Sequence, residues 1–238
     1  MHTMKNYNVQ YYDYDSKLLN FENLISELFN VDELCNIHKL LETTDTKLFS
    51  NETDDSTVLH SIFYKKLNNN WQEFIFLYKQ LIQTVVMNIY NVDTLIYQAL
   101  PTFRVQLPNN IAVGGNKTDS KERYGWHKDS DPQYNHPITE KNFILPLTNS
   151  KNTASVYVES FPDSNKFNPV LMNKGQLINF CGAECIHGNK TNVTGKSRVS
   201  FDFRVMLKND YDNTTAKNSK LTNKKFIIGD YYNIMTRG

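Results

Sequence analysis

The stretch "YGWHKDSDP", residues 124–132, contains residue types that can bind a metal ion. His127 and Asp129 are two positions apart. On a strand, side chains with this spacing project from the same face, whereas Lys128 between them points to the other. Imidazole nitrogens and carboxylate oxygens are both ligands of divalent transition metals. The spacing predicts one half of a metal site, and a polar surface turn is the competing interpretation.

A third ligand is available about sixty residues further on, in "ECIHGNK". His187 follows several predicted strands, which can bring it back to the first pair. Two histidines and one carboxylate on one face of a metal leave the opposite coordination positions open, as in non-haem Fe(II) oxygenases. We therefore predict that His127, Asp129 and His187 are the metal ligands and the catalytic centre.

The strand "RVSFDFRV", residues 198–205, has one polar and one apolar face. Arg198, Ser200, Asp202 and Arg204 alternate with valine and phenylalanine. If the polar face lines a cavity, an arginine beside a hydroxyl can bind a carboxylate through parallel hydrogen bonds. Arg198 with Ser200 is therefore a predicted anion clamp. The alternative is a solvent-facing strand on which Asp202 and Arg204 form an ion pair.

Taken together, these motifs resemble a known family. His127-x-Asp129, the distal His187 and Arg198-x-Ser200, with Arg198 eleven positions after His187, look like the Fe(II)/2-oxoglutarate-dependent dioxygenases with a double-stranded β-helix (jelly-roll) core. The segments "WHKDSD", "NFILPLT", "SVYVES" and "HGNKTNVTGKSRVSFDFRV" resemble the StrG-like branch, named for a streptomycin biosynthesis protein. The resemblance covers about residues 100–210.

The resemblance implies a cofactor, a co-substrate and a reaction. Fe(II) would be held by the triad, and 2-oxoglutarate would chelate the metal and place its distal carboxylate on Arg198 and Ser200. Oxidative decarboxylation with O₂ would release succinate and CO₂ and oxidise a C–H bond, usually to an alcohol. The carboxylate ligand at Asp129 favours hydroxylation over halogenation. The implied substrate is a small polar metabolite, such as a sugar, a cyclitol or an amino-acid-like molecule from a natural-product or glycan pathway.

Further polar and aromatic residues could line the same cavity, and for each the alternative is an exposed strand face or a core position. Gln106 and Asn142 are additional candidates for binding the co-substrate. Asp131 is a weaker ligand candidate, because four positions from His127 is not a same-face spacing. Tyr124 could shield the site, and Ser155 and Glu159 form a same-face set with one of the substrate candidates. The candidates for contacting substrate are Arg104, Trp126, Tyr157, Asp202 and Arg204.

Three other interpretations remain open. Cys181 and Cys185 precede His187 closely and allow a zinc site, although no second ligand pair accompanies them. A cupin-like metalloenzyme, either an isomerase or an oxygenase independent of 2-oxoglutarate, would use the triad without needing Arg198. A non-catalytic jelly-roll binding protein would need neither.

The elements that must position these residues follow from hydrophobic periodicity. Residues 16–43 and 56–91 carry apolar side chains at helical spacing, and 30–32 could divide the first helix. After Pro101 the pattern changes to short alternating segments, which predict an antiparallel β core. The strand-length segments are "TFRVQLP", "FILPLT", "SVYVES", "QLINFC", "RVSFDFRVML" and "KFIIGDYY".

The fold class that these patterns indicate is mainly β with N-terminal helices and a double-stranded β-helix core. We expect a single domain over 1–238, in which a mainly helical N-terminal region, residues 1–98, packs on a core with a C-terminal strand, residues 99–238.

Composition narrows the classes of partner. The 238 residues carry a formal net charge of +1 and are 39% hydrophobic. Lysines are scattered among acidic residues, so there is no broad basic surface for nucleic acid. No apolar run approaches the roughly 20 residues of a membrane span. Three cysteines, an odd number, favour a reducing compartment, so we expect a soluble cytoplasmic protein whose partner is a small molecule.

Overall fold

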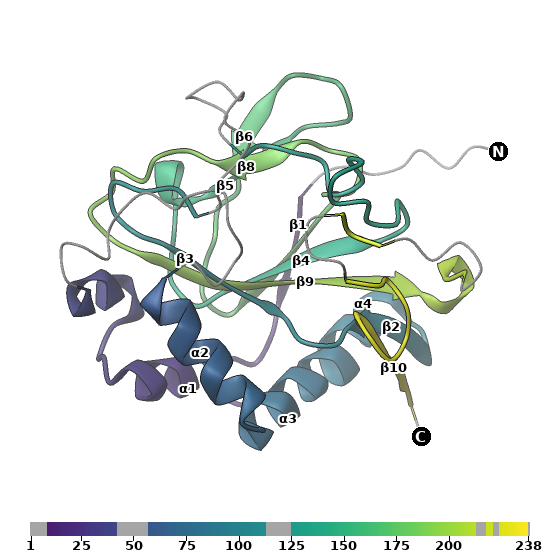
Figure 1. The fold of residues 1–238 in the computed structure, drawn as a ribbon, viewed down its shortest axis with the longest axis horizontal. Coiled ribbons are helices and arrows are strands. Elements are labelled where there is room, and N and C mark those ends of the chain that lie inside the picture. Colours follow the sequence, from purple (N-terminus) through teal and green to yellow (C-terminus); the bar gives the residue numbers. More distant parts are fainter. Residues whose placement is uncertain (1–8, 42–56, 113–124, 213–217, 221–223, 238) are drawn as a thin grey trace.

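The computed structural model describes residues 9–41, 57–112, 125–212, 218–220 and 224–237 (Figure 1). Helices come first along the chain and strands dominate after them. The helical elements are α1 (Phe21–Phe29), η1 (Leu34–Leu40), α2 (Val58–Asn68), α3 (Gln72–Leu81), η2 (Ile82–Val86), α4 (Met87–Tyr90), η3 (Asn152–Ala154) and η4 (Lys208–Asp210). The strands are β1 (Gln10–Asp13), β2 (Thr94–Gln98), β3 (Thr102–Gln106), β4 (Lys141–Pro146), β5 (Val156–Glu159), β6 (Phe167–Pro169), β7 (Gln176–Phe180), β8 (His187–Asn189), β9 (Arg198–Leu207) and β10 (Tyr232–Thr236).

The two predicted helical regions are each divided by an asparagine. Asn30 caps α1 in the left-handed conformation, which confirms a break inside 16–43. The region 56–91, expected as one stretch, is divided between α2 and α3, where Asn70 has φ 65°. Asparagine tolerates this conformation better than other residues with a side chain because its amide can hydrogen-bond locally.

The strands form two antiparallel sheets. The larger has the order β1-β7-β4-β9-β2-β10, with β3 also paired to β9, and the smaller has the order β6-β5-β8. A bridge between His127 and His187 adds the segment at His127 to the edge of the smaller sheet. From β3 onward the chain therefore passes from one sheet to the other: β3, His127, β4, β5 with β6, β7, β8, β9. This alternation is the winding of a double-stranded β-helix, so the predicted fold class is confirmed.

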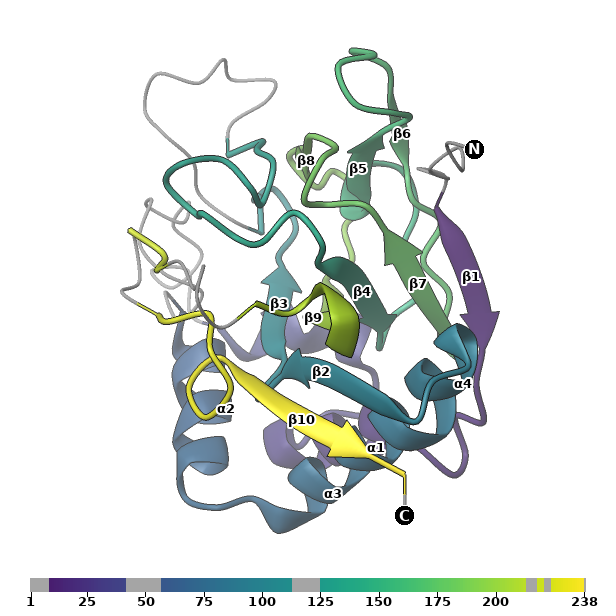
Figure 2. The same ribbon diagram turned by 90° about the vertical axis from the view of Figure 1, so that its right-hand side faces the viewer.

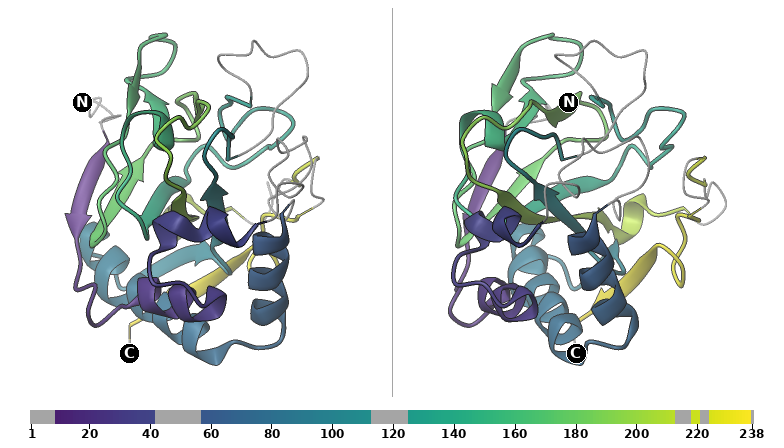
Figure 3. Two further views of the ribbon diagram at one scale, coloured as in Figure 1. Left: turned by 90° about the vertical axis from the view of Figure 1, so that its left-hand side faces the viewer. Right: turned by 60° about the vertical axis from the view of Figure 1, so that its left-hand side comes forward.

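Helices cover the outer face of the larger sheet. Figure 1 shows α1, α2 and α3 on one side of this sheet and the smaller sheet on the other, and Figures 2 and 3 show the same layers from other directions. Phe201 and Phe203 of β9 are buried in the core that these helices form with the sheet. The apolar face of β9 thus points to the helices, and its polar face points between the two sheets.

Within the predicted N-terminal region, residues 1–98, strands β1 and β2 accompany the helices and extend the larger sheet. One predicted strand is wrong. "KFIIGDYY" is not a strand, since Gly229 has φ 92° and the chain turns there. The last strand, β10, begins only at Tyr232 and pairs with β2. Short segments of this kind take their structure from the neighbour they pair with, which local sequence does not reveal.

Within the described ranges, no helix combines the length and the hydrophobicity that a membrane crossing demands.

The aromatic contacts between helices and sheet lead to a stability prediction. Phe63 of α2 is fully buried, and its ring lies 4.6 Å from that of Phe103 and 5.5 Å from that of Phe201. Phe63→Ala should lower the free energy of unfolding by about 3–5 kcal/mol, because it leaves a cavity in this core. Urea denaturation measures the loss. Phe76→Ala is the control, since Phe76 is 61% exposed, and an equal loss in both variants would contradict the packing described.

Candidate active site: a metal centre between the two sheets

The two histidines are brought together by backbone pairing. The His127 N–H donates to the His187 carbonyl at 3.1 Å, and the His187 N–H donates to the His127 carbonyl at 2.9 Å. Gly188 makes room for this pairing, because a Cβ there would overlap the indole ring of Trp126. The absence of a side chain at Gly188 therefore lets Trp126 lie against β8 beside both histidines.

The three predicted ligand side chains converge. Oδ1 of Asp129 lies 3.5 Å from Nε2 of His127 and 3.6 Å from Nε2 of His187. One ligand atom from each of the three residues lies within 4.8 Å of the other two. In the described part of the chain, no other group of three or more histidine, cysteine and acidic residues meets this condition. Adjacent ligands of a single metal, each about 2.1 Å from it, are about 3 Å apart. The donor set and its spacing fit one divalent transition metal ion.

Both imidazoles are oriented by carbonyl groups. Nδ1 of His127 donates to the Gly125 carbonyl at 2.7 Å, and Nδ1 of His187 donates to the Cys185 carbonyl at 3.2 Å. A carbonyl only accepts, so each Nδ1 carries the proton and each Nε2 presents its lone pair to the metal.

Charge at the site is arranged for metal binding at neutral pH. Burial alone raises the pKa of Asp129, but Arg204 and the neighbouring histidines hold that pKa well below its ordinary value. Burial lowers the pKa of His187 to about 4. Asp129 is therefore ionised and His187 neutral, which are the protonation states that ligate metals.

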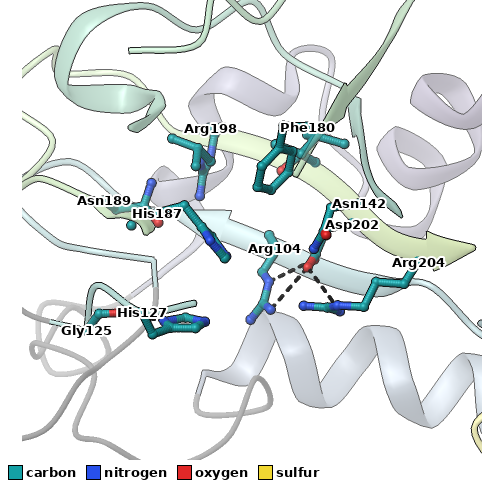
Figure 4. Close-up of a pocket in the computed structure, with 14 residues that line it drawn as sticks. Arg104, Gly125, His127, Asn142, Phe180, His187, Asn189, Arg198, Asp202 and Arg204 are labelled. Atoms are coloured by element: carbon teal, nitrogen blue, oxygen red, sulfur yellow. Dashed lines mark hydrogen bonds and ion pairs between the residues drawn. The ribbon is translucent and has the colours of Figure 1, made fainter. Parts of the chain in front are cut away.

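His127 and His187 line a cavity at the metal position (Figure 4). The polar side chains of β9 line it, as the alternation in "RVSFDFRV" predicts, and this confirms the predicted direction of that face. The remaining lining side chains include Arg104, Asn142, Ile144, Val156, Phe180, His187 and Asn189.

Arg198 lies at this cavity with an incomplete set of hydrogen bonds. Its side chain is buried, and neither Nε nor Nη1 has a partner among the residues that the structure describes. Burial, together with nearby Arg104, lowers the pKa of Arg198 to about 10, so the group is still charged at neutral pH. A buried, unpaired guanidinium is unfavourable by several kcal/mol. The position is therefore strongly favourable for an anion, and Ser200 lines the same cavity.

Two more predicted residues form an ion pair on the cavity wall. Arg104 Nε and Nη2 donate to the two Asp202 oxygens at 2.8 and 3.2 Å. The side chains are 17% and 21% exposed, so the pair is accessible from the cavity.

Asn142 and Arg204 contact the metal ligand itself. Arg204 Nε donates to Oδ2 of Asp129 at 2.8 Å, and Asn142 Nδ2 donates to the same oxygen. Both residues line the cavity, but their side-chain donors are directed at Asp129. The sequence analysis predicted that Arg204 contacts substrate and that Asn142 contacts the co-substrate.

The other candidates lie elsewhere. Gln106 donates from Nε2 to three backbone carbonyls and does not line the cavity. Trp126 and Tyr157 stack on each other, with ring centroids 5.8 Å apart, outside the cavity lining. Glu159 accepts from the N–H groups of Asn165 and Ile186.

Of three weaker candidates, two have structural roles and one lies outside the described residues. Asp131 accepts from the Lys128 N–H and so closes a turn over residues 128–131, which includes Asp129. The extended geometry considered for His127 and Asp129 therefore ends at His127, which is bridged to His187. Ser155 is fully buried, and its carbonyl accepts from Asn189. Tyr124 lies outside the described residues.

The cysteines near His187 belong to a different environment. Cys185 is fully buried in an apolar cluster, and Cys181 packs against the same cluster. Nε2 of His187 is directed to Asp129 instead, so the three residues of the zinc hypothesis do not converge in the described part of the chain.

Sequence reasoning missed residues that support the ligands. Gly182 accepts from the Asp129 N–H at 2.9 Å, and its own N–H donates to Asn142 Oδ1 at 3.1 Å. Glu140 is fully buried behind Arg204, with Nε of Arg204 3.7 Å from Oε2 of Glu140. The position of Gly188 directly after His187 is a local signal that could have identified it as a residue supporting the ligands. Nothing local distinguishes Glu140, because its partners are far away in the chain.

Fold and site together define a mononuclear non-haem metal enzyme with two histidines and one carboxylate as ligands. No protein-family model matches the chain. It is 30% identical over 219 residues to the streptomycin biosynthesis protein StrG of Streptomyces griseus, covering 92% of this chain and 94% of StrG.

Two of the solved structures that the chain resembles are described with 2-oxoglutarate, which is also called α-ketoglutarate. The carbocyclase SnoK from nogalamycin biosynthesis, described as α-ketoglutarate-dependent, is 8% identical, with 97% of this chain and 93% of SnoK covered and a TM-score of 0.46. HygX from Streptomyces hygroscopicus, with nickel, 2-oxoglutarate and hygromycin B bound, is 11% identical, with 85% and 84% covered and a TM-score of 0.44.

The chain belongs to the StrG branch of the Fe(II)/2-oxoglutarate-dependent dioxygenases. The assignment rests on the StrG relative together with the triad, and it makes the protein an enzyme whose cofactor is Fe(II) and whose co-substrate is 2-oxoglutarate. The cupin-like and non-catalytic alternatives are thereby wrong.

The contact between Trp126 and Gly188 leads to a test of ligand placement. Gly188→Ala should weaken Co(II) binding by about 10–100-fold, the usual effect of disturbing groups that orient metal ligands. Calorimetric titration of the metal-free protein measures it. Adding Trp126→Ala to Gly188→Ala removes the overlap and should restore most of the affinity. Co(II) binding at the wild-type level in the single variant would contradict this geometry.

The lowered pKa of His187 predicts how the metal-free protein responds to acid. Between its ordinary pKa of about 6.5 and the folded value of about 4, the unfolded state binds a proton that the folded state does not, so stability falls as pH falls through this window. Acidification from pH 7 to 5 should lower the free energy of unfolding by about 2 kcal/mol more in the wild type than in His187→Gln. Parallel urea titrations measure the difference, and equal losses in both proteins would contradict the assignment.

Proposed function

We propose that the protein hydroxylates a small polar metabolite in a biosynthetic pathway, using Fe(II), 2-oxoglutarate and O₂. The observation that carries the proposal is the buried guanidinium of Arg198, whose Nε and Nη1 have no partner among the described residues and which lines the same cavity as His127 and His187. When bound, iron and 2-oxoglutarate supply oxidative decarboxylation to succinate and CO₂ coupled to oxidation of a C–H bond. The relation to StrG, a streptomycin biosynthesis protein, supports a natural-product or related pathway.

In this proposal each group on the cavity wall has a separate task. His127, Asp129 and His187 hold the metal. Arg198 donates to the distal carboxylate of 2-oxoglutarate and Ser200 adds a hydroxyl donor, both from the cavity face of β9. Burial strengthens these bonds, because water does not compete for the guanidinium.

Apolar and charged groups divide the rest of the cavity. Ile144, Val156 and Phe180 line it from three strands and exclude water from the co-substrate methylene groups. Arg104 and Asp202 present a guanidinium and a carboxylate to the open volume, so they are the groups we assign to substrate recognition. A partner that offers hydroxyl, amino or carboxyl groups satisfies such a wall better than an apolar one.

The clamp is tested by replacing the charge with an apolar side chain of similar length. Arg198→Met should weaken 2-oxoglutarate binding by about 30-fold or more, because the buried carboxylate loses its charged partner. Anaerobic calorimetry with Mn(II)-loaded protein measures co-substrate affinity, while Mn(II) affinity itself should not change. The metal-free variant should be at least as stable as the wild type, since an unpaired buried charge has been removed.

A variant at a surface position just beyond the end of β9 serves as the control. Lys208→Met removes a positive charge at an exposed position just after β9 and should bind 2-oxoglutarate as the wild type does. Wild-type affinity in Arg198→Met would contradict the clamp and direct attention to Arg104.

The reaction is tested by succinate formation in the Fe(II)-loaded wild type with O₂. Sugars, cyclitols and amino acids are then screened for those that stimulate it. A product heavier by one oxygen atom, labelled when ¹⁸O₂ is used, is the expected result. Stimulated turnover that gives an unsaturated or cyclised product instead would contradict hydroxylation, even if the co-substrate chemistry is present.

A further inference from the structure

The two carboxylate oxygens of Asp129 have different surroundings. Oδ1 faces both imidazoles, at 3.5 and 3.6 Å from their Nε2 atoms. Oδ2 accepts hydrogen bonds from Arg204 Nε at 2.8 Å and from Asn142 Nδ2. One oxygen is therefore directed at the metal position, and the hydrogen-bonding capacity of the other is used by two protein donors.

Asn142 is itself fixed by a closed ring of hydrogen bonds. Its Oδ1 accepts from the Gly182 N–H at 3.1 Å, and the Gly182 carbonyl accepts from the Asp129 N–H at 2.9 Å. This ring decides which end of the amide meets Asp129, because only the NH₂ end can donate to a carboxylate. A Cβ at Gly182 would lie 2.7 Å from Asn142 Nδ2, so the ring requires glycine there.

Arg204 is fixed from behind by buried groups. Its side chain is 9% exposed, its Nε lies 3.7 Å from Oε2 of Glu140, and its Nη1 donates to the Tyr231 hydroxyl at 3.3 Å. Glu140 is held in turn by His136 at 2.8 Å and by the Tyr232 hydroxyl. The guanidinium thus has little freedom to leave Asp129.

We propose that Arg204 and Asn142 are positioning residues that restrict Asp129 to ligation through Oδ1 alone. A carboxylate free to rotate can bind a metal through both oxygens, and the second oxygen would then occupy a coordination position that co-substrate or O₂ requires. With Oδ2 held by two donors, one of them charged, that rotation loses both hydrogen bonds. This restriction of Asp129 concerns the metal triad only and is independent of which metabolite is oxidised.

Bound water on Mn(II) gives a direct measure of this restriction. A facial triad leaves three of six positions for water, so ligation through both oxygens should remove one of them and lower the water proton relaxivity of bound Mn(II) by about a third. We expect this fall in Arg204→Met, with Mn(II) affinity lowered by about 10–100-fold. Arg204→Lys, which keeps a charged donor, should be closer to the wild type.

Asn142→Ala provides an independent variant, because it removes one donor to Oδ2 without changing a buried charge. It should show the same direction of change in relaxivity even if Arg204→Met does not fold. Lys128→Gln is the matched control, since Lys128 lies between two ligands but its ammonium pairs with Asp163 at 2.8 Å on the surface. This control should retain wild-type relaxivity and affinity.

The outcomes separate positioning from a merely structural role. A lower relaxivity in Asn142→Ala or Arg204→Met, with wild-type values in Lys128→Gln, supports the proposal. Weaker Mn(II) binding with unchanged or higher relaxivity overturns it, because the ligand mode would then be the same. Wild-type affinity and relaxivity in both variants overturn it as well. None of these results depends on turnover, so they are distinguishable from failure of the proposed hydroxylation.

Discussion

The site depends on a carboxylate that is almost completely removed from water. Asp129 is 1% exposed, and a lone buried carboxylate would be strongly unfavourable. Arg204 and Asn142 stabilise it on one oxygen, and a metal ion shared with His127 and His187 would stabilise it on the other. The metal site and the buried ion pair therefore belong to one arrangement, in which the protein supplies some of the compensating charge and leaves the remainder to the cofactor.

Strand β9 links this arrangement to the rest of the fold. Its residues alternate between two environments with the period of two that a strand imposes. Phe201 and Phe203 pack into the core shared with the N-terminal helices, whereas Arg198 and Arg204 face the cavity. The helices thus fix the strand from its outer side. The same strand carries Arg198, the residue proposed to bind the co-substrate, at its start and Arg204, which holds Asp129, further along.

The sequence was most informative where a residue's role follows from its type and periodicity. The triad and the polar face of β9 could be predicted, because metal-ligating side chains and strict alternation leave few alternatives. The roles of Asn142 and Arg204 could not, because they depend on how β4 and β9 pair, with Asn142 opposite Arg204 in the register. Gly182 is similar, since the need for glycine arises from an amide forty residues away in the chain. His127 is bridged to His187 as on a strand, and the chain turns directly after it over residues 128–131, yet the ligands still converge.

An anaerobic crystal structure with Mn(II) and 2-oxoglutarate tests the central claim most directly, namely that Asp129 serves the metal through one oxygen and the protein through the other. The account predicts the metal bonded to Nε2 of both histidines and to Oδ1 of Asp129, with Oδ2 still on Arg204 and Asn142 and the distal carboxylate of 2-oxoglutarate on Arg198. A metal bonded to Oδ2, or to both oxygens of Asp129, would contradict it.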